Sequence, residues 1–320
     1  MSEIGGYFGL ELGSGSEFHS KAIRLNSGRS CLSYLLAAAV VERLYLPKYL
    51  CDALVDVIRS SDVDCHFYSI DESLEIVDRI ELRQQDRLLY VNYFGLKNRY
   101  VKTLAQRYKE SLIIDNSQAF FANPLVGVDT FYSPRKFFGV ADGGYLYTDK
   151  ALAVQLETAS SAQNALHLLG RIDNGAQNWY QTYLRAEKAI GKQGLMHMSQ
   201  LSRSLLEAVN YDSVLDKRNS NYDYLHEKLS VLNRFELANS KVEGPMIYPF
   251  IGDTKALLRE TLLRESVYIA TYWQEVLMRE RITPVERRLV ENFMPLPVDQ
   301  RYDIGDMQRI VRIIKENIDE

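Results

Sequence analysis

The sequence has few of the residues that identify several common classes of protein. Its 320 residues include only three cysteines, Cys31, Cys51 and Cys65, and no CxxC pair. An odd number of unclustered cysteines predicts neither a disulfide framework nor a zinc site, so we expect reduced thiols. The five histidines show no spacing typical of metal ligands. The sequence therefore predicts no metal site.

An excess of charge and long apolar runs are also absent. The chain has 38 basic and 42 acidic side chains, a formal net charge of −4, which gives no basis for binding a nucleic acid. Apolar runs such as LLAAAVV at 35–41 are far shorter than the roughly 20 residues that cross a bilayer. The N-terminus has no basic segment followed by an apolar one. We therefore expect a cytoplasmic protein that binds neither nucleic acid nor membrane.

The order of apolar segments predicts an α/β fold. From about 30 to 150, short apolar runs alternate with amphipathic stretches, which is typical of a parallel or mixed sheet covered by helices. Beyond 150 the apolar residues recur at helical spacing until MIYPFI at 246–251. That segment predicts a strand, followed by a helix over 254–264, a short strand at ESVYIA (265–270) and a last helix. We expect a large domain over 1–235 and a small C-terminal α/β domain over 236–320.

The sequence has no GxGxxG after a strand, no GxxxxGK[ST] and no GxSxG motif. The residues that could carry chemistry lie between 115 and 144. Asp115 ends the predicted strand SLIID, at the edge of an open α/β sheet where ligands bind, and Gln118 follows it. Lys136 comes 21 residues after Asp115, beyond the predicted strand VDTFYS. Phe137 and Phe138 flank this lysine, and a desolvated amine favours Schiff-base chemistry. Each residue alone is more often structural; only the joint spacing predicts a site.

A second feature lies at the start of a predicted helix. The segment LNSGRSCLSYLL at 25–36 places Ser27, Gly28, Arg29 and Ser30 at the helix N-terminus. Free backbone N–H groups, the helix dipole, a hydroxyl and a guanidinium together suit a phosphate group. An ordinary helix cap explains the same residues equally well. A phosphate site, a strand-end carboxylate and a reactive lysine are what pyridoxal phosphate (PLP) requires.

With these residues in place, the sequence resembles the DegT/DnrJ/EryC1/StrS family of PLP-dependent sugar aminotransferases. The family pattern of Asp, two residues, Gln, a Lys about 20 residues on and then Gly-Gly matches Asp115, Gln118, Lys136, Gly143 and Gly144. The resemblance extends to GGYF (5–8), IDNSQAFF (114–121) and MPLPVDQRYDIGDM (294–307). It implies the type I PLP fold, with a mainly parallel seven-stranded sheet, and a homodimer with active sites at the subunit interface.

The resemblance also implies roles for individual residues. Lys136 is the lysine that bonds the cofactor and then moves a proton, and Asp115 keeps the pyridine nitrogen protonated. The remaining cofactor residues are Gly28, Arg29 and Ser30 at the phosphate, Gln118 at the ring oxygen, Ser133 as a further hydroxyl and Tyr49 as the stacking ring. The substrate residues are Tyr7, Phe8 and Tyr272. The expected reaction transfers an amino group from Glu or Gln to a keto group of a nucleotide-linked sugar or a related small ketone.

Three departures from the family pattern keep a second hypothesis open. Phe131 stands where the family often has a serine, and the position of its usual aromatic falls nearer Cys51 than Tyr49. QGLMHMS at 193–199 has Leu195 and His197 in place of an Asn and an Arg that reach the partner's cofactor. The alternative is a PLP-binding regulatory or partner protein without transaminase activity. Retention of both Lys136 and Asp115 favours the enzyme, and the lysine disfavours the dehydratase branch, which has a histidine instead.

Overall fold

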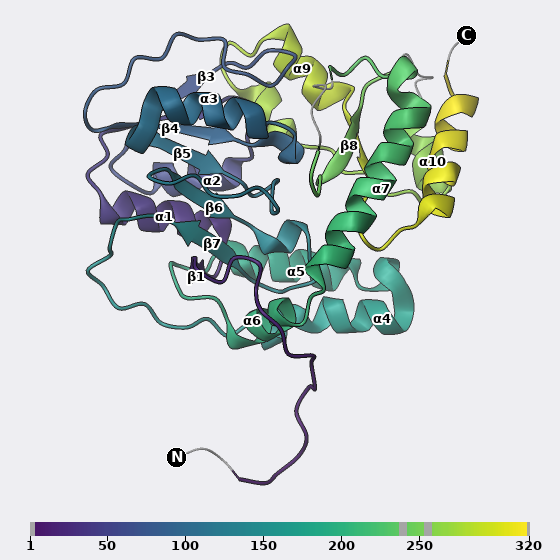
Figure 1. Ribbon diagram of the computed structural model, residues 1–320, viewed down its shortest axis with the longest axis horizontal. Coiled ribbons are helices and arrows are strands. Elements are labelled where there is room, and N and C mark those ends of the chain that lie inside the picture. Colours follow the sequence, from purple (N-terminus) through teal and green to yellow (C-terminus); the bar gives the residue numbers. More distant parts are fainter. Residues whose placement is uncertain (1–3, 237–241, 253–257, 319–320) are drawn as a thin grey trace.

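The computed structural model describes residues 4–236, 242–252 and 258–318. Figure 1 shows a body built on one large sheet, with α7, β8 and α10 grouped on one side of it and an extended N-terminal segment projecting away from it. The strands of the large sheet are β1 (Ile23–Leu25), β2 (Arg43–Pro47), β3 (Asp64–Tyr68), β4 (Asp86–Val91), β5 (Leu112–Asp115), β6 (Asp129–Tyr132) and β7 (Gly144–Tyr147).

The sheet has the mainly parallel, seven-stranded form that the family resemblance implies. Its strand order is β1-β7-β6-β5-β4-β2-β3, and the five strands from β3 to β6 pair in parallel. β7 joins antiparallel to β6, and β1 antiparallel to β7. β4, β5 and β6 are buried almost throughout, as expected of central parallel strands covered on both faces.

Helices cover both faces of this sheet. The connections β2–α2–β3 and β4–α3–β5 run in opposite directions across the sheet, so right-handed crossovers place α2 (Asp52–Arg59) and α3 (Asn98–Tyr108) on opposite faces. Figure 1 shows α3 in front of the sheet and α2 behind it. α1 (Gly28–Ala38) packs beside α2 and against β6 and β7. This arrangement brings the first turn of α1 to the carboxyl ends of the central strands.

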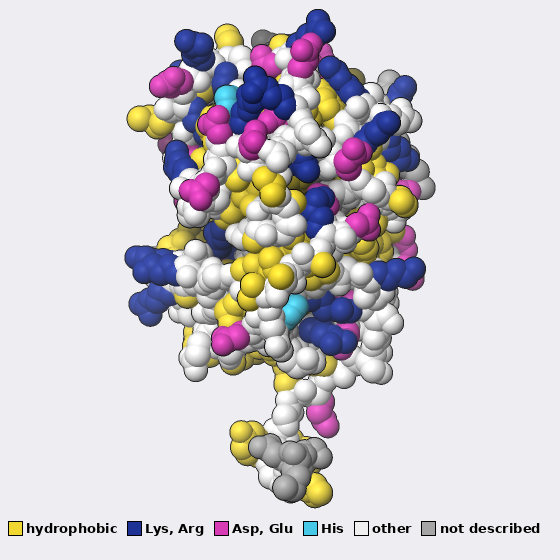
Figure 2. Space-filling view, turned by 90° about the vertical axis from the view of Figure 1, so that its left-hand side faces the viewer, with side chains coloured by type: hydrophobic (Ala, Val, Ile, Leu, Met, Phe, Trp, Pro, Cys, Tyr) yellow, Lys and Arg dark blue, Asp and Glu magenta, His cyan; other side chains and the backbone are white. Residues whose placement is uncertain are grey.

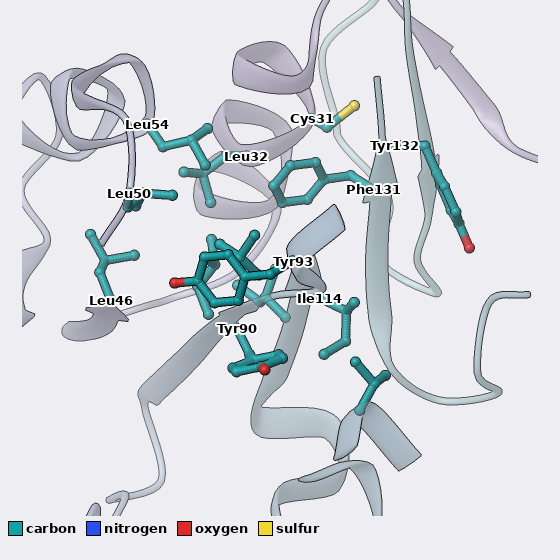
Figure 3. Close-up of a cluster of buried hydrophobic side chains, with 14 of the residues drawn as sticks. Cys31, Leu32, Leu46, Leu50, Leu54, Tyr90, Tyr93, Ile114, Phe131 and Tyr132 are labelled. Atoms are coloured by element: carbon teal, nitrogen blue, oxygen red, sulfur yellow. The ribbon is translucent and has the colours of Figure 1, made fainter. Parts of the chain in front are cut away.

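Side chains alternate across the central strands and divide the core into two layers. In Figure 3, Phe131 points from β6 towards Leu32 of α1, whereas Tyr132 points to the other face of the sheet. Both rings are fully buried. The Tyr132 hydroxyl donates a hydrogen bond to the carbonyl of Ala122 at 2.9 Å, so its polar end is satisfied.

The first helices after β7 lie below and beside the sheet. Figure 1 shows α4, α5 and α6 at the lower edge of the body, and α7 rising from there beside β8 and α10. The bounds are α4 (Leu166–Asn178), α5 (Tyr180–Gly191), α6 (Gln200–Glu207), α7 (Tyr211–Leu229), α8 (Leu258–Arg264), α9 (Pro284–Glu291) and α10 (Ile304–Glu316).

A second hydrophobic cluster forms around a two-stranded antiparallel sheet of β8 (Ile247–Phe250) and β9 (Met294–Pro297). The sequence predicts β8 but not β9. The predicted strand at 265–270 is wrong, because this segment is turn and irregular backbone. Part of the helix expected over 254–264 lies outside the described residues, and α8 accounts for the rest. Tyr222, Leu225 and Leu229 of α7 belong to this second cluster, so α7 contributes to it from before position 236; the boundary at 235/236 stays a prediction.

The surface carries mixed charge. Figure 2 shows the face at the left of Figure 1, where basic and acidic side chains are interspersed around a central band of apolar ones. Within the described ranges, no helix is both long enough and apolar enough to span a bilayer.

Candidate functional site

The site is assembled from the first turn of α1 and the residues that follow β5 and β6. Asp115 is the last residue of β5 and is buried. Its Oδ1 accepts a hydrogen bond from the backbone N–H of Ser117 at 2.7 Å. Burial raises the pKa of Asp115, and the charge of Lys136 together with hydrogen bonds from Ser117 opposes that rise. A buried carboxylate in this position favours a cation in front of it.

Lys136 ends a tight turn that follows β6. The turn, η3 (Pro134–Lys136), is closed by hydrogen bonds from the N–H of Lys136 to the Ser133 carbonyl and from the N–H of Phe137 to the Pro134 carbonyl. Pro134 and Phe137 are buried and anchor the turn, whereas Lys136 is exposed. The charge of Lys136 lowers the pKa of both Asp115 and Cys51, so its amine lies within electrostatic reach of these two groups.

The expected desolvation of Lys136 is wrong for this single chain. The two phenylalanines that suggested it turn into the core, where Phe137 and Phe138 contact Phe120 and Phe121. A sequence pattern of flanking aromatics does not say whether the rings and the lysine share a side of the turn. Here they lie on opposite sides.

The first turn of α1 faces the end of β5. Ser27 is the N-cap, and its hydroxyl accepts a hydrogen bond from the N–H of Ser30 at 3.1 Å. A Cβ on Gly28 would lie 3.4 Å from the hydroxyl of Ser117, so the helix start and the residue after Asp115 are in close proximity. The helix itself offers no acceptor to the N–H groups of Gly28 and Arg29. These two donors and the positive end of the helix dipole suit an anionic group.

Gly143 and Gly144 allow this close assembly. Gly143 has a φ of +137°, which L side chains rarely adopt, and its N–H donates to the carbonyl of Asn26. A Cβ on Gly144 would lie 2.4 Å from the carbonyl oxygen of Ser27. The two glycines thus let β7 pass directly beneath the helix cap. Asp142 before them accepts hydrogen bonds from the N–H and the hydroxyl of Ser199, at 2.8 and 2.6 Å, and fixes the start of α6.

The structure also gives the contacts of four other predicted cofactor residues, Gln118, Arg29, Ser30 and Ser133. The Oε1 of Gln118 accepts a hydrogen bond from the N–H of Phe94 at 3.0 Å, which leaves its Nε2 as the donor. The guanidinium of Arg29 extends to the C-terminal end of α5, where a Cβ on Gly191 would be 3.7 Å from it. Ser30 is buried, with its hydroxyl 2.9 Å from that of Ser27. Ser133 is buried at the start of the η3 turn.

The structure does not support Tyr49 as a stacking residue. Its side chain is completely buried, its ring contacts Tyr93 and Trp273, and its hydroxyl donates to the carbonyl of Leu289. No face of this ring is free for a ligand. Cys51, two residues further on, is only half-buried and lies within electrostatic reach of Lys136 and Asp115.

The predicted substrate residues do not gather at the site of this single chain. Tyr7 and Phe8 are almost fully exposed on the N-terminal segment, which projects away from the body in Figure 1. Tyr272 is half-buried and stacks on Phe94, with ring centroids 5.9 Å apart. His197, which stands in place of a family residue, contacts the Arg24 carbonyl through its Nδ1 and so supports β1.

Two residues near the site were not predicted. Ser117 supplies the hydrogen bonds to Asp115, and its signal was its position two residues after a strand-end Asp, where an Asx-type turn is expected. Arg218 reaches the carbonyl of Phe137 from α7. Nothing local in the sequence indicates a contact across 81 residues.

No protein-family model matches the sequence, and no curated protein matches it. Solved structures do match. The sugar aminotransferase CalS13 from Micromonospora echinospora is 14% identical, with a TM-score of 0.65 over 93% of this chain and 88% of that one. A DegT DnrJ EryC1 StrS aminotransferase from Brucella abortus is 15% identical, with a TM-score of 0.61 over 92% and 85% of the two chains.

The Helicobacter pylori protein PseC, an aminotransferase involved in the biosynthesis of pseudoaminic acid, is 14% identical, with a TM-score of 0.61 over 92% of this chain and 86% of that one. At such identities the likeness is one of fold. The chain therefore has the fold of these sugar aminotransferases of the DegT/DnrJ/EryC1/StrS type.

Proposed function

We propose that this protein is a PLP-dependent aminotransferase that transfers an amino group from Glu or Gln to a keto group of a nucleotide-linked sugar or a related small ketone. One observation carries the proposal. The amine of Lys136 lies within electrostatic reach of the buried carboxylate of Asp115, at the strand ends that face the first turn of α1. These are the positions that a reactive lysine, a carboxylate for a ring nitrogen and a phosphate site require.

The residues fit the cofactor on three independent points. Burial raises the pKa of Asp115, so a protonated pyridine nitrogen is the kind of partner that would hold this carboxylate ionised. Gly28 has no Cβ, and this leaves open the space next to the Ser117 hydroxyl. The free N–H groups of the first turn of α1 can bind a phosphate.

Bound PLP would supply an electron sink for the carbanion that transamination passes through. Lys136 would hold the cofactor through its aldehyde, and its amine would act as the general base that moves the proton of the amino donor. Asp115 would hold a proton on the ring nitrogen. The remaining cofactor residues would be Gly28, Arg29 and Ser30 at the phosphate, with Ser133 beside them and Gln118 donating from Nε2.

The sugar substrate is supported by the fold neighbours, which include sugar aminotransferases. Tyr272 is the described aromatic residue that we place nearest an acceptor, since its half-buried ring stacks on Phe94, close to Gln118. We keep Tyr7 and Phe8 as substrate residues only for an assembly in which the N-terminal segment folds against another subunit. The cysteines are free, which suits a cytoplasmic enzyme.

We propose that the working form is a homodimer. α4 and α5 expose apolar side chains, Leu166, Leu169, Ile172, Tyr180, Tyr183 and Leu184. This surface borders the site, because Glu187 of α5 pairs with Arg135 of the η3 turn. A second copy would cover it and restrict water around Lys136. Sedimentation should give twice the chain mass. Ile172→Glu should shift the protein towards monomer, whereas Val126→Glu, at an exposed apolar residue outside α4 and α5, should not.

The function is tested by a half reaction. Protein that has bound PLP should be yellow, and adding glutamate alone should remove that absorbance and release one 2-oxoglutarate per chain. A yellow protein that responds to no amino donor would favour the non-catalytic binder. A panel of nucleotide-linked keto sugars then identifies the acceptor. Lys136→Ala, which lacks the amine, is the negative control.

A further inference from the structure

Arg218 is a buried cation whose hydrogen bonds go to uncharged oxygens. It lies in α7 and its side chain is almost entirely buried. Its Nε donates to the side-chain oxygen of Gln300 at 3.0 Å, and one terminal nitrogen donates to the carbonyls of Pro245 and Met246. Burial lowers the pKa of Arg218 to about 10, which still leaves it charged near neutral pH. Burying a charge is costly unless it is hydrogen-bonded or paired, and here the four hydrogen bonds and the nearby charge of Asp299 offset that cost.

Arg218 and Gln300 converge on a single backbone atom next to the reactive lysine. The carbonyl oxygen of Phe137 accepts hydrogen bonds from Gln300 Nε2 at 2.7 Å and from Arg218 at 3.4 Å. The Arg218 guanidinium also lies over the Phe137 ring, 4.5 Å from its centroid. Phe137 directly follows Lys136. Two donors and one cation–π contact thus hold the exit of the turn that presents the lysine.

The two donors come from the part of the chain that includes the second hydrophobic cluster. α7 begins with Tyr211, whose ring contacts Phe120 and Phe138 of the first cluster, and ends in the second cluster with Leu225 and Leu229. Arg218 lies between these two ends. Gln300 follows β9, which is part of the second cluster. The position of this second group of elements is therefore transmitted to the backbone at Phe137.

We propose that Arg218 and Gln300 are positioning residues that fix the direction of the Lys136 amine by clamping the Phe137 carbonyl. This proposal rests on the proposed function in one respect, since that function gives the Lys136 amine a reaction to perform. The effect on the backbone does not depend on that function, because loss of the Gln300 donor should loosen the turn whether or not the lysine bonds a cofactor.

Gln300→Glu removes the hydrogen bond to the Phe137 carbonyl and keeps the one from Arg218. A carboxylate at this position still accepts from Arg218 Nε, and more strongly because it is charged, but it cannot donate to the Phe137 carbonyl. Asn221→Ala is the matched control. Asn221 is buried in the same helix and donates to the carbonyls of Val298, Asp299 and Tyr302, without contacting the lysine turn.

Three measurements on the full-length chain test the proposal. Amide hydrogen exchange reports the backbone of residues 136–138. The rate at which trinitrobenzenesulfonate labels Lys136, followed by peptide mapping across a pH series, reports the amine without any cofactor. The thermal midpoint reports stability. We expect Gln300→Glu to speed exchange at 136–138 about fivefold, the factor that a net hydrogen bond of about 1 kcal/mol corresponds to, to shift the Lys136 labelling profile, and to lower the midpoint less than Asn221→Ala does.

Asn221→Ala should lower the midpoint and leave both lysine-turn readouts unchanged. The proposal is overturned if Gln300→Glu matches wild type at residues 136–138 and in labelling, or if Asn221→Ala produces the same change in both. If the clamp readouts respond as expected but wild-type protein takes up no PLP, the proposed function fails and the clamp stands.

Discussion

Gly144→Ala should damage the phosphate end of the candidate site through one steric contact. A Cβ at this position would lie 2.4 Å from the carbonyl oxygen of Ser27, 2.6 Å from its carbon and 2.8 Å from Cys31 Sγ. Ordinary contact begins at 3.4 Å, so β7 and the cap of α1 must separate by about 1 Å. Overpacking against backbone typically costs about 1–3 kcal/mol of unfolding free energy.

The displaced group is the helix start that is proposed to hold the phosphate. Hydrogen bonds weaken steeply when donor and acceptor move apart by such a distance. We therefore expect Gly144→Ala to lower the free energy of unfolding by about 2 kcal/mol and to weaken PLP binding at least tenfold, measured by denaturant unfolding and by absorbance titration.

Gly139→Ala is the matched control for this substitution. Gly139 lies in the same connection, and a Cβ there would meet only a side-chain atom of Leu168 at 3.7 Å. It should leave both measurements near wild type. If Gly144→Ala also binds PLP normally and unfolds with an unchanged free energy, then β7 does not approach Ser27 as described and the cradle is misplaced.

Three further predictions address charge. Asp115→Asn should retain PLP uptake and thermal stability, since a neutral amide loses less solvation on burial than a carboxylate does, but lower turnover by about a hundredfold or more; normal turnover would remove Asp115 from its assigned role. Burial lowers the pKa of His19 from 6.5 to about 4, so its stabilising effect is complete above pH 6.5 and falls as pH drops towards 4. Denaturant unfolding should show a loss of about 2 kcal/mol between pH 7 and pH 5 that is absent in His19→Gln; an identical pH dependence in the variant would refute this. Lys136→Met should raise the pKa of Cys51 further and slow its alkylation, followed by peptide mapping; an unchanged rate would mean that the two side chains are not close.

Sequence reasoning predicted that Asp115 and Lys136 lie near each other because its signals are local and directional. Asp115 and Lys136 each follow a run of apolar residues that forms a buried strand, and parallel neighbouring strands end at the same edge of a sheet. The alternation of apolar runs with amphipathic stretches likewise predicted a parallel or mixed sheet covered by helices.

The missed strands lack such a signal. β1 has only three residues, too few for an apolar pattern to be recognised. It pairs with β7 at Gly144, where a side chain would collide with the cap of α1. β9 contains Pro295 and Pro297, residues that normally argue against a strand. It is tolerated because its sheet has only two strands, so each keeps an edge without a partner strand.

The sequence also does not predict in which direction individual side chains point. Tyr49 and Cys51 lie two residues apart around a bend, and the sequence LPKYLC does not show which of them faces the strand ends. The ring went into the core with Tyr93 and Trp273, and the thiol towards Lys136. Arg218 lies in a largely polar helix, where an arginine is ordinarily solvated. Its burial depends on contacts with Gln300 and Phe137 that only the tertiary fold creates.

The identity of the lysine that bonds PLP tests the central claim most directly. Incubation with PLP, reduction with borohydride and peptide mapping should place the phosphopyridoxyl group on Lys136, at about one group per chain, and Lys136→Ala should remain unlabelled. Labelling of another lysine, or no uptake of PLP by the wild-type protein, would contradict the account.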